Sequence, residues 1–164
     1  MKNIQDNFIA GIGNTPLIKL RGPSELTGCN IFGKAEYLNA GGSVKDRAAL
    51  ALIRDAEEKK LISKRGTIIE GTAGNTGIGL CHIGNSLGYK TIIVMNNNQT
   101  QEKKDALINI GAELRLVPPK PYKDDGNYVK VAGRLADELR SENNHGVVWA
   151  NQFDNIANSK GHYE

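Results

Sequence analysis

Residues 67–95 read TIIEGTAGNTGIGLCHIGNSLGYKTIIVM and predict a strand, a helix and a second strand in close succession. The run 91–95 carries no charge, as expected of a central parallel strand that is buried on both faces. Gly88 stands just before this strand, where the C-terminal cap of the helix belongs. Because a helix between two short strands favours parallel pairing, this stretch predicts a parallel α/β sheet.

The same alternation continues on both sides of this unit. It predicts an α/β fold in which an open, mostly parallel twisted sheet is flanked by helices. Strands are expected at 31–36, 67–70, 91–95, 114–117 and 147–150. Helices are expected at 44–60, 75–87, 101–110 and 128–142.

Composition narrows the class of protein. The chain has 164 residues, 39% of them hydrophobic and 24% charged, with a net charge of +3. This is ordinary globular composition, and the scattered basic residues give no reason to expect nucleic acid or an anionic membrane as a partner. The apolar run 92–95 is too short to span a membrane, and the first residues lack the apolar core of a secretory signal. Since Cys29 and Cys81 form no CxxC pair, a reducing cytoplasmic location is expected.

The first loop whose residues could take part in a reaction is 39–47, NAGGSVKDR. Ser43 is a good helix N-cap, and Asp46 three residues later resembles the acidic partner of a capping box. Lys45 then falls in the first helical turn, where the helix dipole disfavours a cation and so favours the neutral amine that Schiff-base chemistry requires. Taken by itself, however, the loop fits a solvated surface lysine better than a lysine that forms a Schiff base.

The second loop is 71–77, GTAGNTG, which follows a strand and opens a helix. Free N–H groups at a helix start, with glycines that let a ligand approach the backbone, form a site for an anion such as a carboxylate or phosphate. The loop lies at the carboxyl end of a strand, where open α/β sheets bind ligands. A plain glycine-rich turn fits this loop equally well.

Other motifs carry less weight. Residues 28–35 nearly match a Walker A loop, but Ala35 replaces the Ser/Thr that binds Mg²⁺, and the segment reads as entry into a strand. Residues 71–79 lack the G-x-G-x-x-G spacing of a dinucleotide site. Cys81 and His82 are adjacent and cannot both face one metal from a helix, so no metal site is expected. Trp149 is expected to pack in the core.

Four short motifs occur in a specific order: IGNTPL at 12–17, GGSVKDR at 41–47, GNTG at 74–77 and NQFDN at 151–155. Together they resemble the fold-type-II pyridoxal-phosphate enzymes, most closely the cysteine synthase (O-acetylserine sulfhydrylase) family. The resemblance covers the whole chain and favours the functional interpretation of Lys45.

The resemblance implies a role for each matching residue. Lys45 corresponds to the lysine that links covalently to pyridoxal 5′-phosphate, and Asn75 to the side chain that binds the 3′ oxygen of the cofactor. The loop that grips the substrate α-carboxylate would comprise Thr72, Ala73, Gly74, Asn75 and Thr76, joined by Gln152. Ala73 replaces a serine that many members carry, and Ala40 replaces a frequent proline.

The reaction that the resemblance implies is β-replacement, in which O-acetyl-L-serine and sulfide give L-cysteine and Lys45 acts as anchor and general base. Cystathionine β-synthase and serine/threonine dehydratase share the fold and are enzymatic alternatives. A further alternative is a non-catalytic remnant that binds a partner peptide. Family members form homodimers, and the C-terminal tail of serine acetyltransferase is an expected partner.

The resemblance also implies a division into domains. Residues 1–38 would open the larger cofactor-binding domain, 39–150 would form the smaller mobile domain, and 151–164 would begin the return to the larger one. The glycine-rich loop that cups the cofactor phosphate in the family, and the serine that faces the pyridine nitrogen, find no match in the chain. The chain is therefore expected to be an incomplete fragment with little or no activity.

Overall fold

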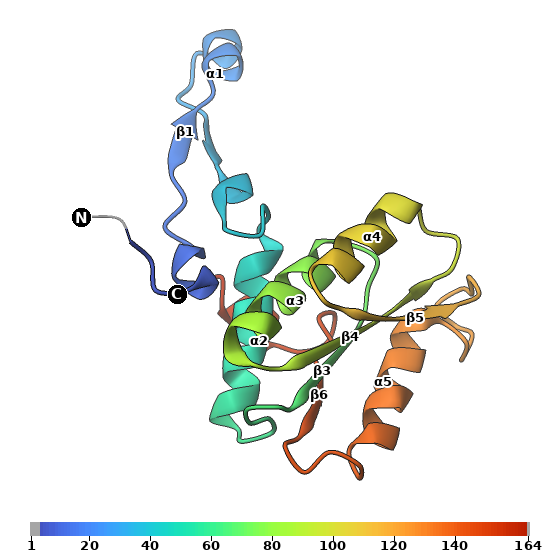
Figure 1. The fold of residues 1–164 in the computed structure, drawn as a ribbon. Coiled ribbons are helices and arrows are strands. Elements are labelled where there is room, and N and C mark those ends of the chain that lie inside the picture. The colour runs from blue at the N-terminus through green and yellow to red at the C-terminus, as the bar shows by residue number, and fades with distance from the viewer. Residues whose placement is uncertain (1–3, 164) are drawn as a thin grey trace.

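The computed structural model describes residues 4–163, which form an α/β unit with a projecting N-terminal arm (Figure 1). A four-stranded parallel sheet has the order β5-β4-β3-β6. Its strands are β3 (Thr67–Gly71), β4 (Lys90–Asn96), β5 (Glu113–Val117) and β6 (Val147–Trp149). All four were predicted within one residue at each end, and the expected fold class is confirmed.

Four helices follow the predicted alternation. They are α2 (Lys45–Glu58), α3 (Asn75–Leu87), α4 (Gln101–Asn109) and α5 (Tyr128–Leu139). The bounds of α3 are as predicted, because Gly88 adopts the left-handed conformation (φ 78°) that ends the helix. The other three are one to three residues shorter than expected at their ends.

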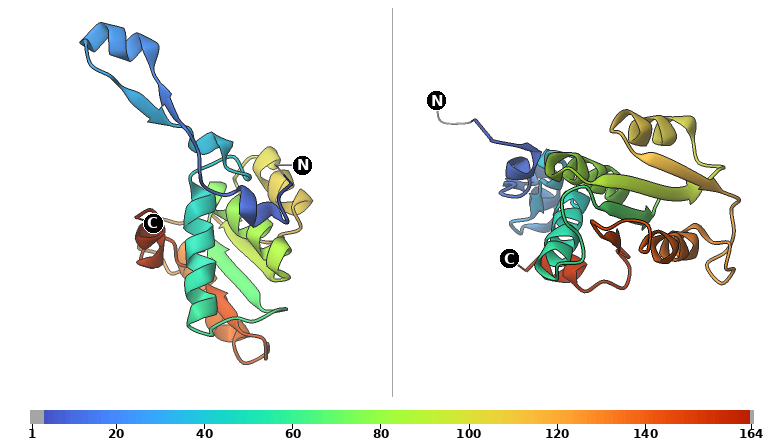
Figure 2. Two further views of the ribbon diagram at one scale, coloured as in Figure 1. Left: turned by 90° about the vertical axis from the view of Figure 1, so that its left-hand side faces the viewer. Right: turned by 60° about the horizontal axis from the view of Figure 1, so that its bottom comes forward.

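The sheet is covered on both faces (Figure 2). Ile68 of β3 packs with α2 and α3, whereas the next residue, Ile69, packs with α5 on the opposite face. α4 joins α3 over the first face, where Leu107 contacts Ile93 and Met95. Because both faces are covered, every residue of β3 is buried, as expected of a central parallel strand.

Trp149 belongs to the core on the α5 face, as predicted. It packs against the cluster that includes Ala132 and Ala136. Gly133 makes this contact possible, because a Cβ there would lie 3.0 Å from the indole ring. The ring of Trp149 thus fixes α5 against β6.

The N-terminal arm comprises β1 (Leu17–Lys19), α1 (Arg21–Thr27) and β2 (Phe32–Lys34). β1 and β2 pair antiparallel and project away from the main sheet (Figures 1 and 2). The strand expected at 31–36 is therefore shorter, and it lies outside the parallel sheet. It ends early because Glu36 begins a short 3-10 helix, Glu36–Leu38.

Two further expectations concern this arm. β1 and α1 were not predicted, because a three-residue strand and a seven-residue helix carry too few positions to show a period. The segment 28–35 leads into β2, as expected, and Gly28 ends α1 with φ 68°. It is therefore not the strand-to-helix loop of a Walker A motif.

Two short elements complete the fold. A 3-10 helix, Phe8–Gly11, lies near α3, and α6 (Ala157–Lys160) packs on α2. Within residues 4–163, no helix is both long and apolar enough to cross a bilayer.

Gly71 provides a test of how the sheet and α5 fit together. A Cβ at Gly71 would lie 2.6 Å from the Cα of Val129 and 2.8 Å from the carbonyl oxygen of Tyr128. Since backbone cannot move aside cheaply, Gly71→Ala is expected to lower the free energy of unfolding by about 1–3 kcal/mol. Urea denaturation measures the change.

Gly22→Ala is the matched control, because a Cβ at this position in α1 meets no atom within 4 Å. It is expected to be neutral or to stabilise α1 by up to about 1 kcal/mol. Equal effects of the two substitutions would contradict the proposed contact at Gly71.

Candidate functional site

The two predicted loops lie together because α2 and α3 pack against each other near their N-terminal ends (Figure 1). Lys45 is the first residue of α2, and Asn75 is the first residue of α3. Gly79 allows the contact: a Cβ there would lie 3.1 Å from that of Ala49 and 3.3 Å from the carbonyl oxygen of Lys45. Lys45 is half-buried, so it is not the fully solvated lysine that the loop alone favoured.

The loop before α2 is held by side chains that accept backbone hydrogen bonds. Ser43 was predicted to be the N-cap, but α2 begins one residue later than expected and its N-cap is Val44; Ser43 Oγ nevertheless accepts from the Lys45 N–H (3.1 Å). Asp46 is fully buried, and its Oδ2 accepts from the Gly41 N–H (2.7 Å). The sequence predicted only a capping-box role for this side chain, and the contact with Gly41 was not expected. Burial raises the pKa of Asp46, while the N–H groups of Gly41 and Ser43 oppose this shift.

A polar network ties the N-terminal motif to this loop. Arg47 Nε donates to Glu36 Oε2 (2.8 Å), and the Thr15 hydroxyl donates to Glu36 Oε1 (2.5 Å). Asn39 Oδ1 accepts from the Gly13 N–H (2.8 Å), and its Nδ2 donates to the Ser43 carbonyl oxygen (3.0 Å). The motifs at 12–17 and 41–47 therefore meet through Glu36 and Asn39, neither of which was singled out from the sequence.

The loop before α3 has the form expected of an anion site. Thr72 is buried, its N–H donates to Val94 O (3.0 Å), and its Oγ1 accepts from the Gly74 N–H (3.3 Å). Gly74 precedes α3 without a side-chain cap, and Gly74 and Asn75 are exposed. A Cβ at Gly74 would meet no atom within 4 Å, so a ligand can approach the backbone there. Ala73 packs against the cluster formed by α3, β4 and α4.

Gln152 reaches this loop from the far end of the chain. The Thr76 hydroxyl donates to Gln152 Oε1 (2.5 Å), and Gln152 Nε2 donates to Glu70 Oε1 (3.3 Å). Thr76 and Gln152, two predicted site residues separated by 76 positions, are thus brought into direct contact. Glu70, Gln152 and Thr76 form a continuous hydrogen-bond chain.

A tight turn after β6 places Gln152. Asn151 adopts the left-handed conformation (φ 46°), which asparagine tolerates better than most residues. Its carbonyl oxygen accepts from the Asn155 N–H (2.9 Å), and Asn158 Nδ2 donates to the Gln152 carbonyl oxygen (2.8 Å). The motif at 151–155 therefore has a structural role in orienting Gln152.

Glu70 was not predicted as a site residue. Its side chain is fully buried, and burial raises its pKa to about 7, although the N–H groups of Asn151 and Gln152 and the Gln152 side chain lower it. The sequence contains one signal for it: a carboxylate within the otherwise uncharged strand that precedes the glycine-rich loop.

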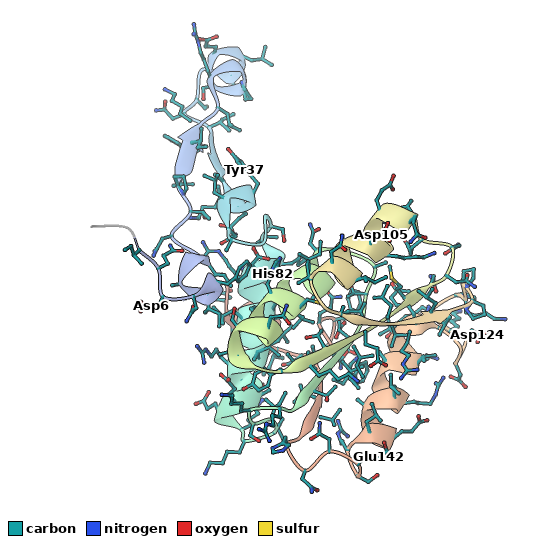
Figure 3. All side chains as sticks on the ribbon, viewed as in Figure 1. Asp6, Tyr37, His82, Asp105, Asp124 and Glu142 are labelled. Carbon is teal, nitrogen blue, oxygen red and sulfur yellow. The ribbon has the colours of Figure 1, made fainter. Side chains whose placement is uncertain are left out.

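The histidines and cysteines form no second site. His82 stacks on Phe8 with ring centroids 4.3 Å apart, and Figure 3 shows it on α3 where the N-terminal segment passes. Burial lowers the pKa of His82 and raises that of Cys81 to about 12. Among the residues that the structure describes, no cluster of His, Cys, Asp and Glu is arranged to hold a metal ion.

Comparison with known protein families agrees with this geometry. Residues 9–164 match the sequence pattern of the family described as "Pyridoxal-phosphate dependent enzyme". The chain belongs to this family. The resemblance noted from the four motifs is therefore confirmed.

Within this family, the chain is similar to proteins named cysteine synthase. It is 52% identical to cysteine synthase 1 of Neurospora crassa over 99% of its own length, and 53% identical to cysteine synthase 1 of Emericella nidulans over 93%. It is 42% identical to cysteine synthase of Dictyostelium discoideum over 98%. The chain spans 40–42% of the length of these three relatives.

Two solved structures show the same fold as this chain. The crystal structure of O-ureido-L-serine synthase matches 98% of this chain with a TM-score of 0.81 and 33% identity, and the match covers 48% of that structure. A hydrogen sulfide-producing enzyme from Fusobacterium nucleatum matches the whole chain with a TM-score of 0.79 and 34% identity, over 51% of its own length.

The residues of the site fit pyridoxal phosphate and an amino acid. A half-buried lysine stands at the start of α2, and the neighbouring helix α3 begins with exposed backbone at Gly74 and Asn75. An amine can form a covalent link to an aldehyde, and N–H groups at a helix start suit a carboxylate. The lysine therefore fits the family's cofactor, and the loop fits an anion such as a carboxylate.

The Arg47–Glu36 pair provides a test of the network that supports Lys45. Hydrogen bonding from Arg47 is the largest of the effects that lower the pKa of Glu36 to about 2. Arg47→Met is therefore expected to lower the free energy of unfolding by about 1–3 kcal/mol at neutral pH. Because the folded-state pKa lies below the unfolded value of 4.5, this stabilisation is present above pH 4.5 and is lost as the pH falls through about 2.

Arg21→Met is the matched control, because the Arg21–Glu25 pair is exposed to solvent. Its effect is expected to stay below about 1 kcal/mol. Denaturant titrations between pH 2.5 and 7 compare the two variants with the parent. The difference in the free energy of unfolding between Arg47→Met and the parent should become smaller at low pH. A difference that stays constant would show that the stabilisation does not come from the ionised Glu36 side chain.

Proposed function

We propose that this chain carries the lysine and the carboxylate-binding loop of a cysteine synthase, for pyridoxal-phosphate-dependent formation of L-cysteine from O-acetyl-L-serine and sulfide. The observation that carries the proposal is the packing of α2 on α3, which sets Lys45 beside the helix that begins at the 72–76 loop. The identity of 52% to cysteine synthase 1 of Neurospora crassa supports this choice within the family.

In this proposal Lys45 has two roles. Its amine would hold the cofactor covalently, and the same amine, when free, would take the proton from the substrate α-carbon. When bound, pyridoxal phosphate supplies a ring that accepts the electron pair left at that carbon. Asn75, at the start of α3, would hold the ring through its 3′ oxygen.

The 72–76 loop and Gln152 hold the substrate carboxylate. The N–H groups at the start of α3 lie at the positive end of the helix dipole, which attracts an anion. Thr76 and Gln152 supply polar side chains next to these groups. Because backbone N–H groups do much of the binding, alanine at position 73 in place of serine is compatible with the role.

The rest of the assembly follows from the family. We infer that 1–38 belongs to the larger domain, 39–150 forms the small mobile domain, and 151–164 returns to the larger one. Homodimerisation, binding of the C-terminal tail of serine acetyltransferase at the 72–76 loop, and a cytoplasmic location are part of the same proposal.

Reconstitution with pyridoxal phosphate tests the role of Lys45. The parent chain is expected to develop the visible absorbance of lysine-bound pyridoxal phosphate, whereas Lys45→Ala is not. Borohydride reduction followed by peptide mass spectrometry should locate the modification on Lys45. Lys103→Ala, which removes a lysine on α4, is the control and should behave as the parent.

Two outcomes would contradict this role. Labelling of other lysines to the same extent in the parent and in Lys45→Ala would show nonspecific attachment. Absence of the band from the parent would show that this chain does not hold the cofactor by itself.

Substrate choice separates the proposed reaction from its alternatives. O-acetyl-L-serine with sulfide is expected to give slow L-cysteine formation that Lys45→Ala abolishes, because the amine is both anchor and base. L-serine with homocysteine should give no cystathionine, and L-serine alone should give no pyruvate. Chromatography of the products distinguishes the three reactions, and a preference for either serine reaction would overturn the assignment to cysteine synthase.

A further inference from the structure

The hydrogen-bond chain Glu70–Gln152–Thr76 has a direction. An ionised carboxylate can only accept hydrogen bonds, so the Gln152 amide must turn its N–H toward Glu70. Its carbonyl oxygen then faces Thr76 and accepts from the Thr76 hydroxyl. In this direction the hydroxyl proton of Thr76 is already committed to Gln152 and is not available to a ligand at the loop.

A proton on Glu70 reverses the chain. The neutral carboxyl group can donate to Gln152 Oε1, which turns the Gln152 N–H toward Thr76 Oγ1. The Thr76 hydroxyl then accepts from Gln152, and its own proton is free to point into the 72–76 loop. Protonation also removes a negative charge close to the position where a carboxylate would bind.

We propose that Glu70 is a positioning residue whose proton sets the direction of the Glu70–Gln152–Thr76 chain, and thereby whether Thr76 can donate to a carboxylate at the 72–76 loop. The part that concerns a carboxylate ligand rests on the proposed function. The coupling of Gln152 and Thr76 to Glu70 does not, since it follows from the contacts of these three side chains alone.

The surroundings of Glu70 make both protonation states accessible. Its side chain has no exposed surface, and Oε2 has no hydrogen-bond partner among residues 4–163, so the ionised form is poorly satisfied. Hydrogen bonds from Asn151 and Gln152 offset part of this cost, and the resulting pKa of about 7 lies near neutrality.

No neighbouring charge accounts for this behaviour. Helices α2 and α3, which cover the face that Glu70 shares with Ile68, carry the titratable side chains Asp46 and His82. They act on each other electrostatically but not on Glu70, whose shift arises from burial and from the three hydrogen-bond donors of Asn151 and Gln152. On β4, the residue paired with Glu70 is Ile93, which is apolar.

NMR of the isotope-labelled 164-residue chain between pH 5 and 9 tests the coupling directly. The Glu70 carboxyl carbon, the Gln152 side-chain amide and the Thr76 methyl group are expected to shift with one common midpoint. In Glu70→Gln the Gln152 and Thr76 signals should lose this pH dependence. Glu57→Gln, which changes a carboxylate near the other end of α2, should keep it.

A second variant keeps the test decisive if Glu70→Gln fails to fold. In Gln152→Ala the carboxyl group of Glu70 should still titrate, whereas the Thr76 methyl group should no longer follow it. Gln152 signals that stay constant across the pH range in the parent would overturn the proposal. Thr76 signals that continue to titrate in Gln152→Ala would also overturn it.

L-serine is the probe for the link to carboxylate binding. Because one proton is coupled to binding, its affinity is expected to fall by up to about tenfold for each pH unit above the midpoint in the parent. In Glu70→Gln the affinity should be independent of pH. Failure of L-serine to perturb Thr76 at any pH would contradict the proposed role of the loop, while the titration of Gln152 separately decides the role of Glu70. Serine binding with an unchanged affinity from pH 6 to 9 in the parent would overturn the coupling to the ligand.

Discussion

The close contact of α2 with α3 is the constraint on which the site depends. Gly79 lets the two helices approach so closely that a Cβ at this position would lie 3.1 Å from that of Ala49 and 3.3 Å from the Lys45 carbonyl oxygen. A larger side chain at Gly79 would separate the helices, and with them the lysine and the glycine-rich loop. A glycine within α3 lowers its intrinsic helix propensity, and this close packing explains why Gly79 is nevertheless present.

Around this contact the protein buries two carboxyl groups, Asp46 and Glu70. Each has one oxygen with no hydrogen-bond partner among the described residues, and burial raises the pKa of both. Such groups oppose stability, because an unsatisfied buried acceptor loses its hydration without full compensation. Their positions beside the two loops indicate that the polar framework is arranged for function, with the apolar clusters on either side of the sheet providing the stability.

The longer helices and the strands of the main sheet were predictable from local sequence patterns. α3 was located to the residue, since a strand precedes it and Gly88 ends it. By contrast, β1 and β2 consist of three residues each and exist because they pair with one another across the arm. A strand of that length has no periodicity of its own, so neither the pairing nor the projection of the arm could be inferred locally.

The sequence by itself determined the α/β class, the two loops and the identity of Lys45 and the 72–76 segment as candidates, because these features depend on short-range spacing. Only the tertiary structure revealed the roles of Glu70, Glu36 and Asn39. Their contacts with Gln152, Arg47 and Gly13 join residues 11 to 82 positions apart, and the direction of a hydrogen bond depends on which donor and acceptor the fold brings together. Long-range polar contacts produce no periodic pattern in a sequence, so Glu70, Glu36 and Asn39 could be assigned only from the tertiary structure.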